Sequence, residues 1–209
     1  MKILDIPQGT PEWLSARSGH VTASRINDLM ARIKTGEAAA RRDYKAQIVA
    51  EILTGTPQGD TFTNDAMRWG TETEPFARAA YETRAGVLVD EVGFVLHPTI
   101  ERGGASPDGL VGEDGLVELK CPKTATHLTY LLDGVVPSQY QNQMLWQMAC
   151  CERSWCDFAS FDPRLPEDMQ LFVVRFPRDD ARIAAIEAEV NAFLAEVDNI
   201  VTRLRNRAA

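Results

Sequence analysis

An aspartate and a glutamate ten residues apart, with a lysine just behind them, are the side chains best suited to chemistry. Asp108 follows a Ser-Pro pair, and Glu118, Leu119 and Lys120 close the segment. The two carboxylates and the backbone carbonyl of Leu119 supply the hard oxygen ligands that Mg²⁺ prefers. A lysine beside a bound metal can orient or deprotonate a water and stabilise charge on a phosphate. This set predicts metal-dependent hydrolysis of a phosphodiester.

The residues between the two acids predict a β-hairpin that brings them together. Two apolar pairs, residues 110–111 and 116–117, flank the turn-forming residues 112–115. Because side chains alternate along a strand, Glu118 and Lys120 share one face, and the leucine between them points to the other. A Pro-Asp-Gly turn or a Glu-x-Lys strand alone is a common surface feature, so the inference depends on their combination.

These segments resemble a known family of nucleases. Residues 106–110 (Ser-Pro-Asp-Gly-Leu) and 118–122 (Glu-Leu-Lys-Cys-Pro) resemble the lambda exonuclease branch, the YqaJ-type phage recombination exonucleases, of the PD-(D/E)xK nuclease superfamily. The resemblance implies the restriction-endonuclease-like α/β fold, with a central mixed β-sheet flanked by helices. It also implies two Mg²⁺ ions, for which Mn²⁺ can substitute, held by Asp108, Glu118 and the Leu119 carbonyl.

Two stretches nearer the N-terminus extend the resemblance. Residues 13–24 are similar to the opening motif of the family, in which an arginine and a serine bind the DNA 5′-phosphate, and Arg17 and Ser24 match those positions. Residues 69–74 are similar to its Trp-Gly-x-x-x-Glu motif, which implies that Glu74 completes the acidic cluster and assists in catalysis.

Two later stretches follow in the order of the family. Residues 140–143 are similar to a Tyr-x-x-Gln helix whose tyrosine and glutamine lie at the catalytic centre, and residues 158–164 are similar to the strand and turn that come next. The resemblance therefore implies that Tyr140, Gln143 and Ser106 join the arginine and serine above in binding DNA and its 5′-phosphate.

One departure concerns the separation of the DNA strands. A member of the family has an arginine a few residues after Lys-Cys-Pro for this purpose, where this chain has residues 123–126, Lys-Thr-Ala-Thr. Met67 does match a family position that carries an apolar wedge, and it is therefore assigned to strand separation.

Length and composition limit the other possibilities. The chain has 209 residues with 44% hydrophobic content, which suits a single nuclease domain over residues 1–209. No apolar run approaches the roughly twenty residues of a membrane span, and the N-terminus has no signal-peptide pattern, so we expect a cytoplasmic protein without a membrane partner. The four cysteines lack the spacing of a zinc site, and we expect reduced thiols.

The net charge of −8 is unusual for a DNA-binding protein, because affinity for nucleic acid comes largely from Lys and Arg. Part of the negative charge belongs to the proposed metal ligands. If the protein forms the homotrimer ring that the resemblance implies, an acidic exterior and a basic channel can coexist. The candidates for a local basic cluster are Arg32, Lys34, Arg41, Arg42 and Lys45.

Hydrophobic periodicity predicts the elements that position these residues. We expect helices that begin at Pro11, that cover residues 37–54, 64–85 and about 138–150, and that run from Asp179 to the C-terminus. We expect strands at residues 3–6, 87–89, 93–97, 155–161 and 171–175, besides the hairpin. The long C-terminal helix has apolar residues at alternating intervals of three and four, which we expect to pack on the sheet rather than in a coiled coil between subunits.

Four side chains have competing interpretations. Ser24 could cap the helix that follows, and without the resemblance capping and phosphate binding are about equal alternatives. On a helix, Glu72 and Glu74 point about 200° apart, so only one can face the metals, and the family motif favours Glu74. By itself Arg17 would be a surface salt-bridge partner.

Glutamines at positions 139, 143 and 147 form one stripe of a helix at intervals of four residues. Such a stripe is usually solvated surface. Here it accompanies Tyr140, and a glutamine can hydrogen-bond a phosphate or a ligating carboxylate without adding charge.

The hypothesis from the sequence is a Mg²⁺-dependent, processive 5′→3′ exonuclease that degrades one strand of double-stranded DNA for phage recombination. The natural partner is a single-strand-annealing recombinase. Three alternatives stay open: a structure-specific or repair endonuclease of the same superfamily, a non-catalytic DNA-end-binding module, and a metal-binding protein without a nucleic-acid partner. The intact set of Asp108, Glu118 and Lys120 argues against the last two.

Overall fold

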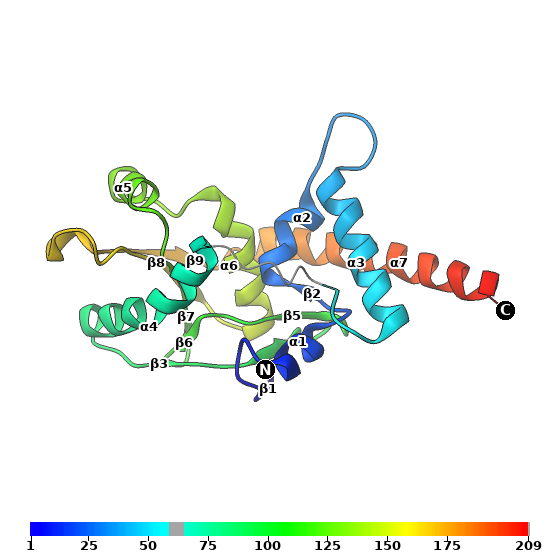
Figure 1. Cartoon of the computed structure of the whole chain (residues 1–209), viewed down its shortest axis with the longest axis horizontal. Coiled ribbons are helices and arrows are strands. Elements are labelled where there is room, and N and C mark those ends of the chain that lie inside the picture. Colours follow the sequence, from blue (N-terminus) through cyan, green and yellow to red (C-terminus); the bar gives the residue numbers. More distant parts are fainter. Residues whose placement is uncertain (59–64, 209) are drawn as a thin grey trace.

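Two mixed β-sheets with helices on their faces form the framework of the protein (Figure 1). The computed structural model describes residues 1–58 and 65–208. Asn64, where the predicted helix 64–85 begins, lies outside these residues. The strands are β1 (Lys2–Leu4), β2 (Val21–Thr22), β3 (Val89–Asp90), β4 (Phe94–Leu96), β5 (Gly103–Ala105), β6 (Gly109–Val111), β7 (Gly115–Lys120), β8 (Trp155–Phe161) and β9 (Leu171–Pro177). The helices are α1 (Pro11–Arg17), α2 (Ile26–Met30), α3 (Ala39–Thr54), α4 (Asp65–Ala85), α5 (Thr124–Asp133), α6 (Ser138–Cys151) and α7 (Asp180–Ala208), with 3₁₀ turns η1 (Ala23–Arg25) and η2 (Glu167–Met169).

The five-stranded sheet, in the order β3-β6-β7-β8-β9, carries the predicted hairpin. Strands β6 and β7 are antiparallel, with Gly109 opposite Val117 and Val111 opposite Gly115. The turn begins at Gly112, whose φ of +55° favours glycine. Strands β7 and β8 are parallel, so the sheet is mixed, as expected for an α/β fold. The register places Asp108, just before β6, beside the end of β7 that carries Glu118, Leu119 and Lys120.

The second sheet has four strands in the order β1-β4-β5-β2, and β5 was not predicted. Its sequence, Gly-Gly-Ala, lacks the β-branched and aromatic residues that mark strands. Glycine is needed at position 104 because a Cβ there would overlap the ring of Phe94. The carbonyl of Gly104 accepts a hydrogen bond from the indole N–H of Trp146, which ties α6 to this sheet.

Helices α4 and α6 contribute to different hydrophobic clusters on the five-stranded sheet. Val117 and Leu119 pack in a cluster with Ala77 and Tyr81 of α4. Leu116 points to the opposite face of β7 and belongs to the larger cluster that includes residues of α6, α2, α3 and α7. Alternation along β7 therefore puts Glu118 and Lys120 on one face, as the sequence predicted, and the packing shows that this is the α6 side.

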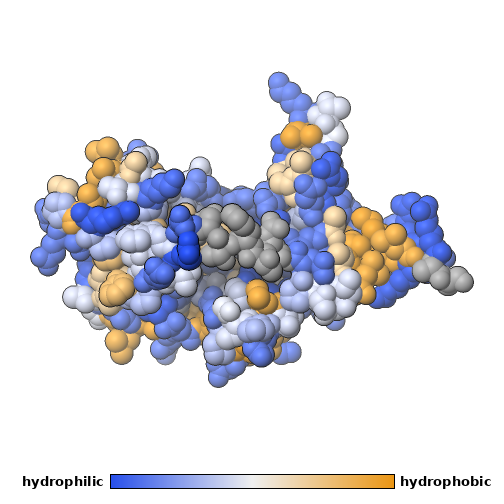
Figure 2. Space-filling view, in the orientation of Figure 1, coloured by the Kyte–Doolittle hydropathy of each residue, from blue (hydrophilic) through white to orange (hydrophobic). Residues whose placement is uncertain are grey.

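The C-terminal helix forms where predicted but packs differently. Its buried apolar residues contact mainly α3, α6 and α2 rather than the sheet, because α6 already covers the sheet on that side. Figure 1 shows that α7 extends beyond the body of the molecule at its C-terminal end. Figure 2 shows apolar atoms over this extension, and Leu204 near the end of the predicted apolar stripe is exposed.

The remaining differences from the prediction are small. Helix α5 was not predicted, although it ends at Gly134 in the left-handed conformation that commonly terminates helices. Strand β3 begins two residues later than expected and β9 extends two residues further.

The four cysteines are free thiols, three of them buried. Within the described residues, no helix is long and apolar enough to cross a membrane.

Candidate active site

The predicted acidic residues meet at the end of strands β6 and β7. Asp108 is fixed by a hydrogen bond from the backbone N–H of Leu119 to its Oδ2 at 2.7 Å, which crosses the hairpin. Glu118 is fully buried on the α6 side. Folding of one short hairpin is therefore sufficient to bring these two carboxylates together.

The ammonium group of Lys120 identifies where a cation fits. Its Nζ forms an ion pair with Glu118 Oε1, donates to the carbonyl of Leu119 at 3.0 Å, and lies 3.8 Å from Asp108 Oδ2. These are the three oxygens that the sequence proposed as metal ligands. Because they already surround a positive charge, the donor set fits a hard divalent cation such as Mg²⁺.

Two glutamines of α6 hold Glu118 in position. Gln143 Nε2 donates to Glu118 Oε1 at 2.5 Å, and Gln147 Nε2 donates to Oε2 at 2.6 Å. Both are members of the predicted stripe, whereas Gln139 donates to the hydroxyl of Tyr130 instead. Gln147 was not proposed as a site residue, although its spacing of four from Gln143 was the signal that could have identified it.

Glu74 approaches the centre from α4 but is turned toward a cation of its own helix. Its carboxylate is 3.2 Å from Arg78, which also pairs with Glu91 at 2.5 Å. Glu72, the alternative, is exposed, as the family motif predicted. Within the described residues no three metal-binding side chains form an assembled site. Because its Oε1 is engaged by Arg78, Glu74 would have to exchange this ion pair to become a metal ligand through that oxygen.

Burial and mutual repulsion change the pKa values at this centre. Desolvation, together with the charges of Glu118 and Glu74, raises the pKa of Asp108 to about 8. Burial alone would lower the pKa of Lys120, but Glu118 and Asp108 raise it well above its ordinary value. Lys120 is therefore a cation and a hydrogen-bond donor in this state, which suits stabilisation of negative charge.

Tyr140 also lies at the catalytic centre. Its ring stacks on Phe158 with the centroids 5.3 Å apart, and the Nζ of Lys120 is 5.5 Å from its centroid. Tyr140 is thus adjacent to Lys120, and Gln143 to Glu118. Neither lines the separate pocket that contains the two N-terminal phosphate candidates.

That pocket, here called the Arg17 pocket, has a volume of about 180 Å³ and is lined by α1, η1, α3 and the segments between them. Burial lowers the pKa of Arg17, and its Nε has no hydrogen-bond acceptor within the described residues. The donors Arg17, Ser24 and Arg25 line the pocket together with the carboxylate of Glu51. Arg25 already pairs with Asp28, so the pocket offers mainly the guanidinium of Arg17 and the hydroxyl of Ser24 to a small anion.

Ser24 is not a helix cap. It lies within η1, is exposed in the pocket, and neither η1 nor α2 has a side-chain cap. Glu51 supports the pocket from α3 by accepting hydrogen bonds from the backbone N–H of Gly19 at 2.7 Å and of Gln58 at 3.2 Å. Glu51 had no role in the sequence hypothesis because its partners are distant in the chain.

A hydrogen bond and a stacked ring connect the Arg17 pocket to the catalytic centre. The guanidinium carbon of Arg17 lies 3.9 Å from the ring centroid of Trp13. The indole N–H of Trp13 donates to Ser106 Oγ at 2.9 Å, and Ser106 is two residues before Asp108. Ser106 therefore contributes to the connection between the two regions rather than to the lining of the pocket.

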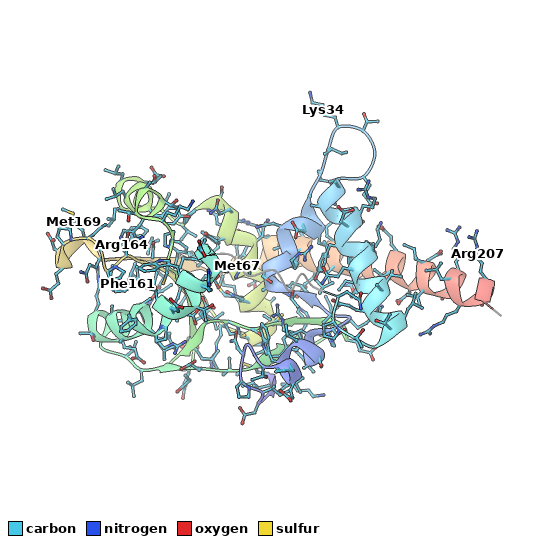
Figure 3. The ribbon with its side chains drawn as sticks, viewed as in Figure 1. Lys34, Met67, Phe161, Arg164, Met169 and Arg207 are labelled. Atoms are coloured by element: carbon cyan, nitrogen blue, oxygen red, sulfur yellow. The ribbon has the colours of Figure 1, made fainter. Side chains whose placement is uncertain are left out.

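The predicted basic cluster is largely neutralised. Arg41 and Lys45 share ion pairs with Glu37 and Glu196 at 2.5–2.9 Å. Arg32 pairs with Glu189, and Arg42 pairs with Asp43. Only Lys34 of the five, labelled at the loop before α3 in Figure 3, has no ion pair within the described part of the chain. The predicted local cluster of basic residues is therefore offset by acids from the loop before α3, from α3 and from α7, which the sequence analysis did not consider.

Met67 lies in the first turn of α4 with its side chain exposed (Figure 3). It precedes Glu74 by about two helical turns, so it is outside the group of carboxylates. Its assignment to strand separation stays a prediction.

Comparisons with known proteins agree with this geometry. Residues 12–154 match the model of the YqaJ-like viral recombinase domain. No similar sequence was found among curated proteins. The crystal structure of an alkaline exonuclease (LHK-Exo) from Laribacter hongkongensis has 50% sequence identity and a TM-score of 0.87, over 95% of this chain and 98% of that chain. The structure of LHK-Exo in complex with dAMP has 51% identity, a TM-score of 0.88 and the same coverage.

A more distant structure shares the fold. A phage-related exonuclease from Haemophilus somnus 129PT has 15% identity and a TM-score of 0.69, over 88% of this chain and 96% of that chain. The α/β fold with mixed sheets, flanking helices and a long C-terminal helix is confirmed by these similarities.

Proposed function

This chain belongs to the YqaJ-like viral recombinase family, and we propose that it is a DNA exonuclease that uses divalent metal ions to degrade one strand of a duplex from its 5′-phosphorylated end. The family is the one that its sequence motifs resemble. The observation that carries the proposal is the convergence of Asp108, Glu118 and the Leu119 carbonyl on one cation. Its relative LHK-Exo is described as an alkaline exonuclease and was crystallised with dAMP, a 5′-nucleotide of the kind that such a reaction releases.

The acidic residues of the hairpin hold the metal in this proposal. Asp108, Glu118 and the Leu119 carbonyl bind Mg²⁺, or Mn²⁺ in its place, and Glu74 completes the site after leaving Arg78. Two bound ions supply Lewis-acid stabilisation of the scissile phosphate and an activated water. Gln143 and Gln147 act as positioning residues, because they occupy the outer lone pairs of Glu118 and fix the direction of its carboxylate.

Lys120 supplies positive charge to the reacting phosphate. With Glu118 and Asp108 engaged by a metal, the ammonium of Lys120 would be free to donate to the water or to a phosphate oxygen. Tyr140, beside the lysine, borders the same space and contributes to DNA binding.

The Arg17 pocket binds the terminal 5′-phosphate in this proposal. Arg17 and Ser24 provide the donors, and the Nε of Arg17 is a buried donor that an anion would satisfy. The Trp13–Ser106 connection fixes the distance between this phosphate and the catalytic acids. A fixed distance would set the length of the released product.

The wider assignments follow from family membership. We propose a single nuclease domain over residues 1–209, acting as a homotrimer ring in the cytoplasm of a bacterial host, encoded by a phage or prophage. Processive 5′→3′ resection would leave 3′ single strands for a single-strand-annealing recombinase. Met67 would part the strands. The exposed apolar end of α7, including Leu204, is a surface that other copies could cover.

A single digestion experiment tests the proposal. The substrate is a linear duplex with a 5′-phosphate on one end only, in the presence of Mg²⁺, beside a covalently closed circle and the variant Lys120→Ala. We expect directional loss of the phosphorylated strand, an intact circle and an inactive variant. Nicked circles would move the assignment to an endonuclease, and absence of metal-dependent cleavage would leave a DNA-end-binding module.

A further inference from the structure

Arg164 is held in one orientation at the edge of the catalytic centre. It follows the end of β8, where the fully buried carboxylate of Asp162 accepts three hydrogen bonds from it: one from the backbone N–H at 3.0 Å, one from Nε at 2.7 Å and one from Nη2 at 3.0 Å. Nη2 also donates to the carbonyl of Pro122 at 3.3 Å. The side chain is nevertheless 47% exposed. It combines a fixed direction with access from solvent, which lowers the entropy cost of binding a ligand.

The guanidinium also packs on an aromatic ring of α4. Its central carbon lies 4.5 Å from the ring centroid of Trp69, five residues before Glu74. Five residues of helix span about 7–8 Å along the axis. The indole N–H of Trp69 has no acceptor within the described residues. Arg164 thus lies over the part of α4 that leads to the proposed metal site.

Sheet topology places Arg164 at the same end of the sheet as the catalytic lysine. Strands β7 and β8 are parallel, with Lys120 opposite Ser160, so Asp162 continues past this end. Pro122, which binds Arg164, is two residues after Lys120. In Figure 3 both Arg164 and Met67 belong to the half of the molecule that holds α4 and the five-stranded sheet.

The outer edge of the guanidinium has hydrogen-bond donors to spare. An arginine side chain has five N–H groups, three of them on Nε and Nη2. Those two nitrogens bind Asp162 and Pro122, whereas Nη1 has no acceptor among the described residues. Guanidinium N–H groups are common donors to DNA phosphates.

We propose that Arg164, supported by Asp162 and Trp69, is a DNA-binding residue whose Nη1 contacts a backbone phosphate of the duplex just outside the metal centre. The inference rests on the proposed function, because it takes DNA as the substrate. It assigns a positively charged DNA contact to a chain whose net charge is −8. The occupant is the phosphate backbone, so the contact is independent of base sequence.

A second arginine provides a matched control. Arg175 on β9 pairs with Asp157 through the same two nitrogens, at 2.8 and 3.0 Å, and lies 3.5 Å from the ring centroid of Trp155. It is 57% exposed. Trp155 begins β8, whereas Asp162 follows its last residue, so the two clusters lie at opposite ends of this strand. At about 3.3 Å per residue, they are roughly 20 Å apart along it.

The experiment measures duplex binding at several salt concentrations, with Ca²⁺ in place of Mg²⁺ to limit hydrolysis, for wild type, Arg164→Ala, Arg164→Lys and Arg175→Ala. Each phosphate contact contributes about 0.9 to the slope of log K against log salt. We expect Arg164→Ala to weaken binding about tenfold and to reduce the slope by about 0.9. Arg164→Lys should retain most of the slope, and Arg175→Ala should match wild type.

Two results would overturn the inference. One is an unchanged affinity and slope for Arg164→Ala, and the other is an equal loss for Arg175→Ala, since that would indicate a general effect of removing a surface arginine. Thermal unfolding of each variant detects a folding defect. If Arg164→Ala has such a defect, the test is the comparison of Arg164→Lys with wild type. If wild type binds duplex but fails to digest it, the proposed function fails while the binding result for Arg164 still stands.

Discussion

The catalytic centre and the Arg17 pocket lie at the two ends of the Trp13–Ser106 connection, and they differ in the polar groups that they present to a ligand. At the catalytic centre, burial and the charges of Glu118 and Glu74 raise the pKa of Asp108, and Glu118 pairs with the ammonium of Lys120. In the pocket, burial lowers the pKa of Arg17, and its Nε has no acceptor among the described residues. One region is therefore suited to a cation and the other to an anion. We therefore expect that substitutions can disturb the proposed metal binding and the proposed recognition of the DNA end separately.

The largest expected effect comes from removing charge at the catalytic centre. Lys120→Ala should lower the rate of hydrolysis by about 10²–10⁴-fold, the range that a positioned proton-transfer group contributes. The loss should be equal for 5′-phosphorylated and 5′-hydroxyl ends, because the Arg17 pocket is intact. Single-turnover digestion of both substrates measures it, with DNA binding as the control. A loss confined to phosphorylated ends would contradict the separation of the two regions.

The next effect concerns pH and the metal. Because the pKa of Asp108 is raised to about 8 without metal, a proton must leave before a cation binds at lower pH. The apparent affinity for Mg²⁺ should therefore rise about tenfold per pH unit from 6 to 8 and level off above. Calorimetric titration with Mg²⁺, repeated in buffers of different ionisation enthalpy, detects the released proton.

Glu74→Gln sharpens this test. Glu74 is one of the charges that raise the pKa of Asp108, so the variant should reach its plateau at a lower pH, although with weaker metal binding. Binding of a 5′-phosphate in the Arg17 pocket should not follow the same profile. An affinity for Mg²⁺ that is flat from pH 6 to 8 would show that Asp108 does not bind the metal as proposed.

A smaller and selective effect is expected in the Arg17 pocket. Arg17→Ala should lower kcat/KM on 5′-phosphorylated ends about ten- to hundredfold, since hydrogen bonds to charged groups are worth about 1.5–3 kcal/mol. Activity on 5′-hydroxyl ends should stay near that of wild type. The ratio of the two substrates is the measurement, and Arg17→Lys should restore part of it. An equal loss on both ends would mean that Arg17 supports the fold rather than the phosphate.

The smallest expected effect is that of the glutamines on α6. Gln147→Met removes the donor to Glu118 Oε2 and should weaken Mg²⁺ binding about tenfold, at the low end for partners of metal ligands. Gln139→Met is the matched control, because Gln139 binds the hydroxyl of Tyr130. Titration with Mg²⁺ compares the two. A similar loss in both variants would indicate a change in α6 packing instead of a change in the carboxylate.

Prediction from sequence succeeded where the interactions are local. The hairpin needs only a turn at Gly112 and alternation along β7, and both are visible in consecutive residues. The ends of α3 and α4 are marked by Gly55 and Gly86, each in the left-handed conformation. It failed for β5, since Gly103 and its neighbours form a strand only because other elements surround them.

The hairpin, the order of the main helices and strands, and the proximity of Asp108 and Glu118 follow from the sequence alone. These features depend on periodicity and turn chemistry within a few residues. Tertiary packing is needed for the two glutamines to hold Glu118, for Trp13 to connect Arg17 to Ser106, and for Arg164 to bind the carbonyl of Pro122, two residues after Lys120. It also decided that the basic residues of α3 are neutralised by Glu196 of α7. Such contacts join residues 25 or more positions apart, and their geometry depends on how the sheets and helices pack.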